Sequence, residues 1–163
     1  VLPVVFCTTI VPTLVSARRD DPARYAKLVR QLYGGLGWLG IFIAILMLFF
    51  GEEIIHLLYG ARYAGSLEVV WVLALTLPLS FMGFALDNVL QVSGLNKQLF
   101  CRLVFSLLLL VGLNSLLLPK IGVVGAAYAL LASLALLHFG YDLVVKSLRD
   151  QVWLKLAGIG LRF

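Results

Sequence analysis

Four uninterrupted apolar runs constrain the fold of this chain more than any other feature of its sequence. They cover residues 32–50, 67–90, 99–118 and 121–145. At about 1.5 Å of rise per residue, roughly twenty helical residues cross the ~30 Å hydrocarbon core of a bilayer. The runs are continuous rather than alternating, whereas a barrel strand needs only about ten alternating residues. The sequence therefore predicts an all-α, polytopic bundle of transmembrane helices.

A shorter apolar run at residues 1–15 is expected to be part of a fifth span. The chain begins inside this run without an initiating Met, so we expect a fragment, a single transmembrane domain of residues 1–163 whose upstream helices are missing. Overall, 62% of its residues are hydrophobic and 13% are charged, and the mean hydropathy is +1.04. A water-soluble domain is not normally so apolar, so membrane residence is predicted.

Basic residues between the runs predict the orientation of the chain, because Lys and Arg accumulate on the cytoplasmic side. The segment 16–31 is rich in Arg and Lys, whereas the next loop, 51–66, carries Glu52 and Glu53 against Arg62. Alternation then puts the 93–98 turn and the C-terminal tail inside the cell. The net charge of +5 is explained by this distribution, so no nucleic-acid binding is expected.

Two segments show amphipathic patterns typical of interfacial helices. The basic loop 16–31 contains Pro22 followed by apolar residues at helical spacing, and it is expected to lie at the interface before entering the next span. Residues 148–163 predict a cytoplasmic surface helix or the start of a further span. Its expected apolar face is Leu148, Val152, Leu156, Ile159 and Phe163, and its expected polar face is Arg149, Lys155 and Arg162.

Ionisable side chains at membrane depth need an explanation, because each costs about 2.5–3.5 kcal/mol at the bilayer centre. Asp87 lies about one turn before the inner end of its run, and Arg102 about one turn into the next. At similar depth they are expected either to form an ion pair or to reach separately toward water. Asp142 is expected to pair with Lys146, one helical turn on. His138 is interpreted as a packing residue, with proton transfer as the alternative.

No catalytic constellation, phosphate-binding loop or metal-ligand spacing is recognisable, and Cys7 and Cys101 lie alone in apolar runs. The sequence predicts neither an enzyme nor a cofactor or metal site.

A series of short motifs resembles the polysaccharide flippases of the multidrug, oligosaccharidyl-lipid and polysaccharide (MOP) exporter superfamily. In order they are Leu57-Leu58-Tyr59-Gly60, Tyr63, Asn88, Gly94, Asn96-Lys97, Asn114, Leu118-Pro119, Gly122 and Gly125-Ala126-Ala127. The resemblance implies the C-terminal lobe of a two-lobed, alternating-access transporter in the bacterial inner membrane. Such a protein moves lipid-linked oligosaccharide, carried on an isoprenoid diphosphate, from the inner to the outer leaflet.

The same resemblance implies partners and site residues. The partners would be the lipid-linked oligosaccharide, membrane lipids, a coupling proton or sodium ion, and the missing N-terminal lobe. Arg102 would bind the diphosphate, and Asn88 and Asn114 would bind sugar hydroxyls, although Asn114 also suits an interhelical hydrogen bond. The alternatives are a multidrug or cation antiporter of the same superfamily, a membrane polymerase or ligase of glycan assembly, and a membrane scaffold.

Overall fold

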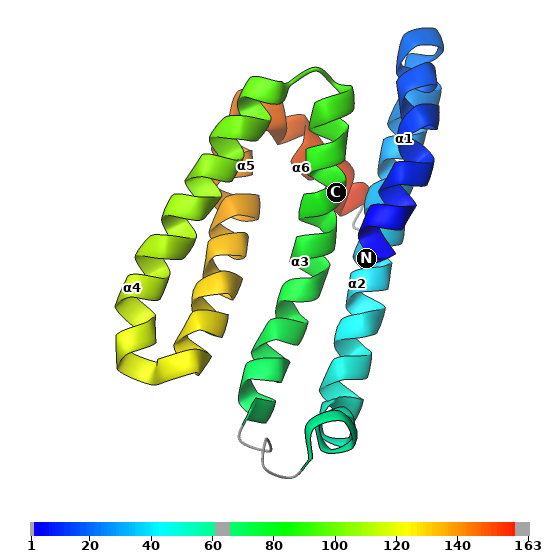
Figure 1. Cartoon of the computed structure of the whole chain (residues 1–163). Helices are drawn as coiled ribbons and strands as arrows, with labels where there is room; N and C mark the ends of the chain where they lie inside the picture. The colour runs from blue at the N-terminus through cyan, green and yellow to red at the C-terminus, as the bar shows by residue number, and fades with distance from the viewer. Residues whose placement is uncertain (1, 61–65, 159–163) are drawn as a thin grey trace.

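The computed structural model describes residues 2–60 and 66–158. Within these ranges it does not describe the side chains of residues 2–6, 8, 58, 59, 146, 147, 150, 152, 156 and 157. Every element in the described part of the chain is a helix (Figure 1). The predicted all-α fold is therefore confirmed for the described residues.

Helices α1 (Leu2–Asp20) and α2 (Pro22–Tyr59) meet at a sharp junction. The Oδ1 atom of Asp21 accepts hydrogen bonds from the backbone N–H groups of Ala23 and Arg24, each at 3.0 Å, and Pro22 occupies the first turn. This is a strong N-terminal cap. The expected interfacial helix and the 32–50 run form one continuous helix, because no cap interrupts α2 before Gly60, whose φ is 78°.

Helices α3 (Leu67–Val92) and α4 (Asn96–Ala135) are joined by a short turn at Gly94, whose φ is 70°. Helix α4 bends at Ile121 and at Gly122, where φ is 63°, and folds back as two antiparallel arms (Figure 1). The arms touch closely, since a Cβ atom added to Gly125 would lie 2.5 Å from the backbone oxygen of Leu117. The predicted runs 99–118 and 121–145 correspond to these arms.

Three helical segments of the described chain are long and apolar enough to cross a membrane: Pro22–Leu57, Leu67–Val92 and Asn96–Val144. The third includes both arms of α4, which accounts for the difference from the four complete spans expected from hydropathy. Long apolar helices of this kind are compatible with a membrane-embedded protein.

The end of the chain departs most from expectation. After α4 come the π-helix η2 (Leu136–Tyr141), the short α5 (Asp142–Val144) and α6 (Lys146–Gly158). Helix α6 packs against α2, where the hydroxyl of Tyr33 donates a 3.0 Å hydrogen bond to Gln151. Lys155, expected on a polar face, is buried. The predictions for Ile159, Arg162 and Phe163, and for the side chains of Val152 and Leu156, concern parts of the chain outside those that the structure describes.

The apolar core gathers at the end of the bundle that holds the α1–α2 junction and the α3–α4 turn (Figure 1). It consists of Cys7, Leu14, Val29, Leu32, Tyr33, Leu36, Ala85, Leu86, Val89, Leu90, Leu99 and Leu148. Farther from this end of the bundle, α2 and α3 are in close contact at Gly40 and Pro78. There is no room for a Cβ atom on Gly40. In contrast, many large apolar side chains of α4 are exposed, including Phe100, Leu107 and Leu108. The described bundle is therefore tightly packed at one end and has an apolar exterior.

Candidate functional site

Five titratable side chains from five helical elements converge beside this core. We call them the charge cluster: Asp87 of α3, Arg102 of α4, His138 of η2, Asp142 of α5 and Lys155 of α6. The short α3–α4 turn sets Asp87 opposite Arg102, and α6 must fold back to deliver Lys155. The cluster therefore exists only because distant segments of the sequence pack together.

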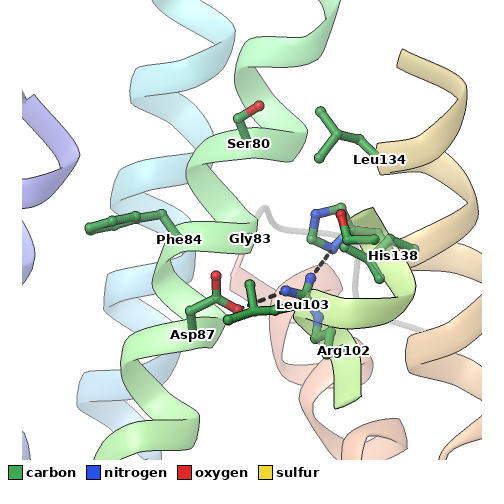
Figure 2. Close-up of a pocket in the computed structure, with 10 residues that line it drawn as sticks. Ser80, Gly83, Phe84, Asp87, Arg102, Leu103, Leu134 and His138 are labelled. Atoms are coloured by element: carbon green, nitrogen blue, oxygen red, sulfur yellow. Dashed lines mark hydrogen bonds and ion pairs between the residues drawn. The ribbon is translucent and has the colours of Figure 1, made fainter. Parts of the chain in front are cut away.

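Arg102 is the centre of the charge cluster, with only 2% of its side chain exposed. Its Nη1 atom donates to Oδ1 of Asp87 at 2.7 Å, and its Nε atom donates to Oδ1 of Asp142 at 2.9 Å. Its Nη2 atom faces Nδ1 of His138 at 3.2 Å (Figure 2). The same atom donates to Oδ2 of Asp142 at 3.5 Å. All three guanidinium nitrogens thus have a partner.

Asp142 is the most enclosed member of the charge cluster, with no exposed side-chain surface. Besides Arg102, its carboxylate accepts a 2.9 Å hydrogen bond from Nζ of Lys155. Burial lowers the pKa of the Lys155 ammonium to about 8, and the Asp142 carboxylate opposes that effect by stabilising the charged amine. Two carboxylates therefore balance two cations, as a buried charge network requires.

The ring of His138 is surrounded by charged neighbours. Nδ1 lies 3.2 Å from two cationic donors, Nη2 of Arg102 and Nζ of Lys155, and 3.3 Å from Oδ2 of Asp142. Nδ1 therefore either accepts from one of the two cations or donates to the carboxylate, and Nε2 is correspondingly a donor or an acceptor. Nε2 is buried and has no hydrogen-bond partner among the described residues.

A pocket adjoins the charge cluster on the side of α3 and α4. It has a volume of about 200 Å³. We call it the α3–α4 pocket, and its lining consists of Ser80, Gly83, Phe84, Asp87, Arg102, Leu103, Ser106, Leu134, Leu137 and His138. Figure 2 shows the ring of His138 opposite the stretch of α3 that carries Ser80, Gly83 and Asp87. A largely apolar pocket with a few polar groups is the usual form of a ligand site.

Of the four sequence-predicted site residues, two contact each other, and the other two form hydrogen bonds within their own helices. Asp87 and Arg102 form a salt bridge, the arrangement considered from their similar depth. The side-chain amides of Asn88 and Asn114 donate instead to backbone oxygens of their own helices, those of Phe84 and Leu110. Neither asparagine lines the α3–α4 pocket.

Sequence reasoning missed the rest of the charge cluster. Asp142 was expected to pair with Lys146, whose side chain lies outside the described residues, but it bonds Arg102 and Lys155. Lys155 was missed because it is far from the apolar runs, and no local pattern indicates that α6 folds back. The only signal was the presence of Asp142 and His138 on an apolar helix, where charge marks function.

Compared with known proteins, the chain matches no protein-family model, no curated protein and no solved structure. The functional proposal therefore rests on the charge cluster, the α3–α4 pocket and the sequence resemblance. Among residues 2–60 and 66–158, no group of three or more His, Cys, Asp or Glu side chains is arranged to hold a metal ion.

Proposed function

We propose that this chain is one lobe of a membrane transporter that flips lipid-linked oligosaccharide from the inner to the outer leaflet. The observation that carries the proposal is the buried charge cluster beside the α3–α4 pocket, in a bundle of long apolar helices. Ionisable residues inside such bundles generally mark a pathway for substrate or ion, because burying them is costly.

Structural stability alone is a weak reason for this cluster. Replacing a buried ion network by well-packed apolar side chains is often neutral or stabilising. Here Arg102, Asp142 and Lys155 are nearly or fully buried, and Arg102 and its partner Asp87 line a cavity. A set of charges retained at such a place is better explained by a part in transport.

The proposed membrane arrangement has four crossings: α2, α3 and the two arms of α4, with α1 as part of another span. Each is long enough at 1.5 Å per residue. The α1–α2 junction and the α3–α4 turn would face the cytoplasm, because basic residues gather there. In the MOP-type C-terminal lobe, located in the bacterial inner membrane, the exposed apolar faces of α4 would meet lipid and the other lobe.

The cluster geometry changes the role expected of Arg102. Because each of its nitrogens already faces Asp87, Asp142 or His138, it binds a diphosphate only if one carboxylate moves away. In the proposed mechanism Arg102 therefore holds the helices of the lobe together, and the substrate contacts come from groups that still have free hydrogen-bonding capacity.

An ion-coupled antiporter is the second candidate, and a specific observation favours it. Such a protein needs acidic residues inside the lobe, and Asp142 is fully buried within the bundle. The two candidates differ in their cargo, since an antiporter exports a free solute whereas a flippase moves a glycan on a lipid.

The test uses the full-length protein that carries this chain, expressed in a flippase-deficient bacterium with the matching glycan pathway. Restored surface polysaccharide is the expected result. If polysaccharide stays absent while the protein is in the membrane and the lipid-linked precursor accumulates, the flippase proposal is wrong and the antiporter is favoured.

A further inference from the structure

A buried hydrogen-bonding atom without a partner among the described residues lies beside the α3–α4 pocket. The His138 side chain is only 5% exposed, and its Nε2 atom has no partner in the part of the chain that the structure describes. Nε2 is a donor where Nδ1 accepts from Arg102 or Lys155, and an acceptor where Nδ1 donates to Asp142. The atom is close to Gly83, which lines the pocket, since a Cβ atom added to Gly83 would lie 3.0 Å from Nε2. Buried polar atoms in native proteins are almost always paired, so a hydrogen-bonding group of a ligand is expected there.

The other polar groups of the pocket indicate what kind of molecule supplies that hydrogen-bonding group. Ser80 and Ser106 contribute hydroxyl groups, which both donate and accept. Asp87 contributes a carboxylate whose Oδ1 bonds Arg102 and whose side chain remains 26% exposed. This carboxylate attracts donors and repels an anion. The mixture of donors and acceptors therefore suits a neutral hydroxylated ligand.

Phosphate is disfavoured by the same geometry. The two cations near the pocket are engaged, Arg102 by Asp87 and Asp142, and Lys155 by Asp142. Their charges are balanced by the two carboxylates, so an added anion would have no counter-charge. A phosphate would also approach the carboxylate of Asp87.

The size and walls of the pocket narrow the ligand further. Its volume of about 200 Å³ is below the ~300–1,000 Å³ of sites for drug-sized molecules, so it suits a single ring. Phe84, Leu103 and Leu134 supply apolar surface, against which the C–H face of a sugar ring packs. We propose that the α3–α4 pocket binds one neutral sugar ring, with Nε2 of His138 forming a hydrogen bond to a ring hydroxyl group, which can both donate and accept.

This inference rests on the proposed function, and it moves sugar recognition from Asn88 and Asn114 to His138, Ser80 and Ser106. Gly83 keeps the site open. Alanine there would bring a methyl group 3.0 Å from Nε2 and 3.1 Å from Cε1 of His138, closing the space that the ligand needs.

The test measures binding without transport. The full-length protein in nanodiscs is titrated with methyl α-D-glucopyranoside and methyl α-D-galactopyranoside, followed by saturation-transfer NMR, and with glucose 1-phosphate as the anionic probe. We expect saturable binding of at least one methyl glycoside, a tenfold or greater loss of affinity in Gly83→Ala, and weaker binding of the phosphate. Gly112→Ala is the matched control, because a Cβ at Gly112 has no neighbour within 4 Å.

Ser80→Ala and Ser106→Ala replace Gly83→Ala as the pocket variants if Gly83→Ala does not fold. Each is expected to weaken glycoside binding severalfold. The inference is overturned if neither glycoside binds saturably, if every pocket variant binds as tightly as the wild type, or if the phosphate binds better. A protein that binds glycoside but fails to restore polysaccharide would retain the site and refute only the flippase proposal. Restored polysaccharide without glycoside binding would support the flippase proposal and refute the sugar site in the α3–α4 pocket.

Discussion

At the scale of single residues, Asp142 determines whether the charge cluster is stable. It is fully buried and accepts hydrogen bonds from both Arg102 and Lys155. Asp87, by contrast, is 26% exposed and bonds only Arg102 within the cluster. Removing one partner from a buried network leaves uncompensated charge, whereas a partly exposed group is helped by water.

We therefore expect Asp142→Asn to lower the free energy of unfolding by about 3–5 kcal/mol and Asp87→Asn to lower it clearly less. Chemical unfolding of the purified protein in detergent measures both. In the double variant Asp142→Asn with Lys155→Met, part of the loss should return, because the uncompensated ammonium is gone. Equal effects of the two aspartate substitutions would contradict the assigned geometry.

The residues also show how far sequence reasoning reaches. Asp87 and Arg102 were expected at similar depth because a short turn joins their helices, and the structure shows the ion pair rather than separate contacts with water. Asn88 and Asn114 were assigned to sugar hydroxyls on the resemblance, with an interhelical hydrogen bond as the alternative for Asn114, but each donates to the backbone oxygen four residues earlier. A single sequence does not reveal whether a side-chain amide donates a hydrogen bond to a backbone oxygen of its own helix.

At the scale of elements, hydropathy locates helices well but not their ends. The α3 boundaries nearly match the 67–90 run, because a capping turn and the polar residues coincide there. Helix α2 continues well beyond 32–50 at both ends, since charged residues do not terminate a helix and Gly60 does. The π-helix at Leu136–Tyr141 and the return of α6 had no periodic signal, because both depend on tertiary contacts.

The burial of Lys155 by α6 predicts a pH effect on stability. Its pKa in the folded protein is about 8, below the ordinary 10.5, so the folded state loses this proton first. Stability should rise between about pH 8 and pH 10.5, by at most about 1.4 kcal/mol per pH unit, while below pH 8 the cost of burying the charged amine is fully present. Unfolding of wild type and Lys155→Met between pH 7 and pH 9.5 measures the difference.

Lys155→Met should lack that rise, since the titrating group has been removed. Other lysines and tyrosines titrate in both proteins and cancel in the comparison. Parallel pH profiles for the two proteins would show that Lys155 is not buried against Asp142, and that α6 does not fold back in the membrane.

At the scale of the whole molecule, the proposed orientation places the α1–α2 junction and the α3–α4 turn inside the cell. Ser66, at the start of α3, and Lys97, at the start of α4, lie at opposite ends of the bundle. In a background with the exposed Cys101 replaced by Ser, a membrane-impermeant thiol reagent should label Ser66→Cys in intact cells and Lys97→Cys only after the cells are opened. The opposite pattern would reverse the orientation.

The most direct test of the central claim is flipping by the purified full-length protein in proteoliposomes loaded with lipid-linked oligosaccharide. Exposure of the glycan on the opposite leaflet is followed with a lectin or glycosidase that does not cross the membrane. The account predicts transfer well above that of protein-free vesicles, reduced at least tenfold by Gly83→Ala and unchanged by Gly112→Ala. Transfer at the rate of empty vesicles, by a protein that is folded and correctly inserted, would contradict it.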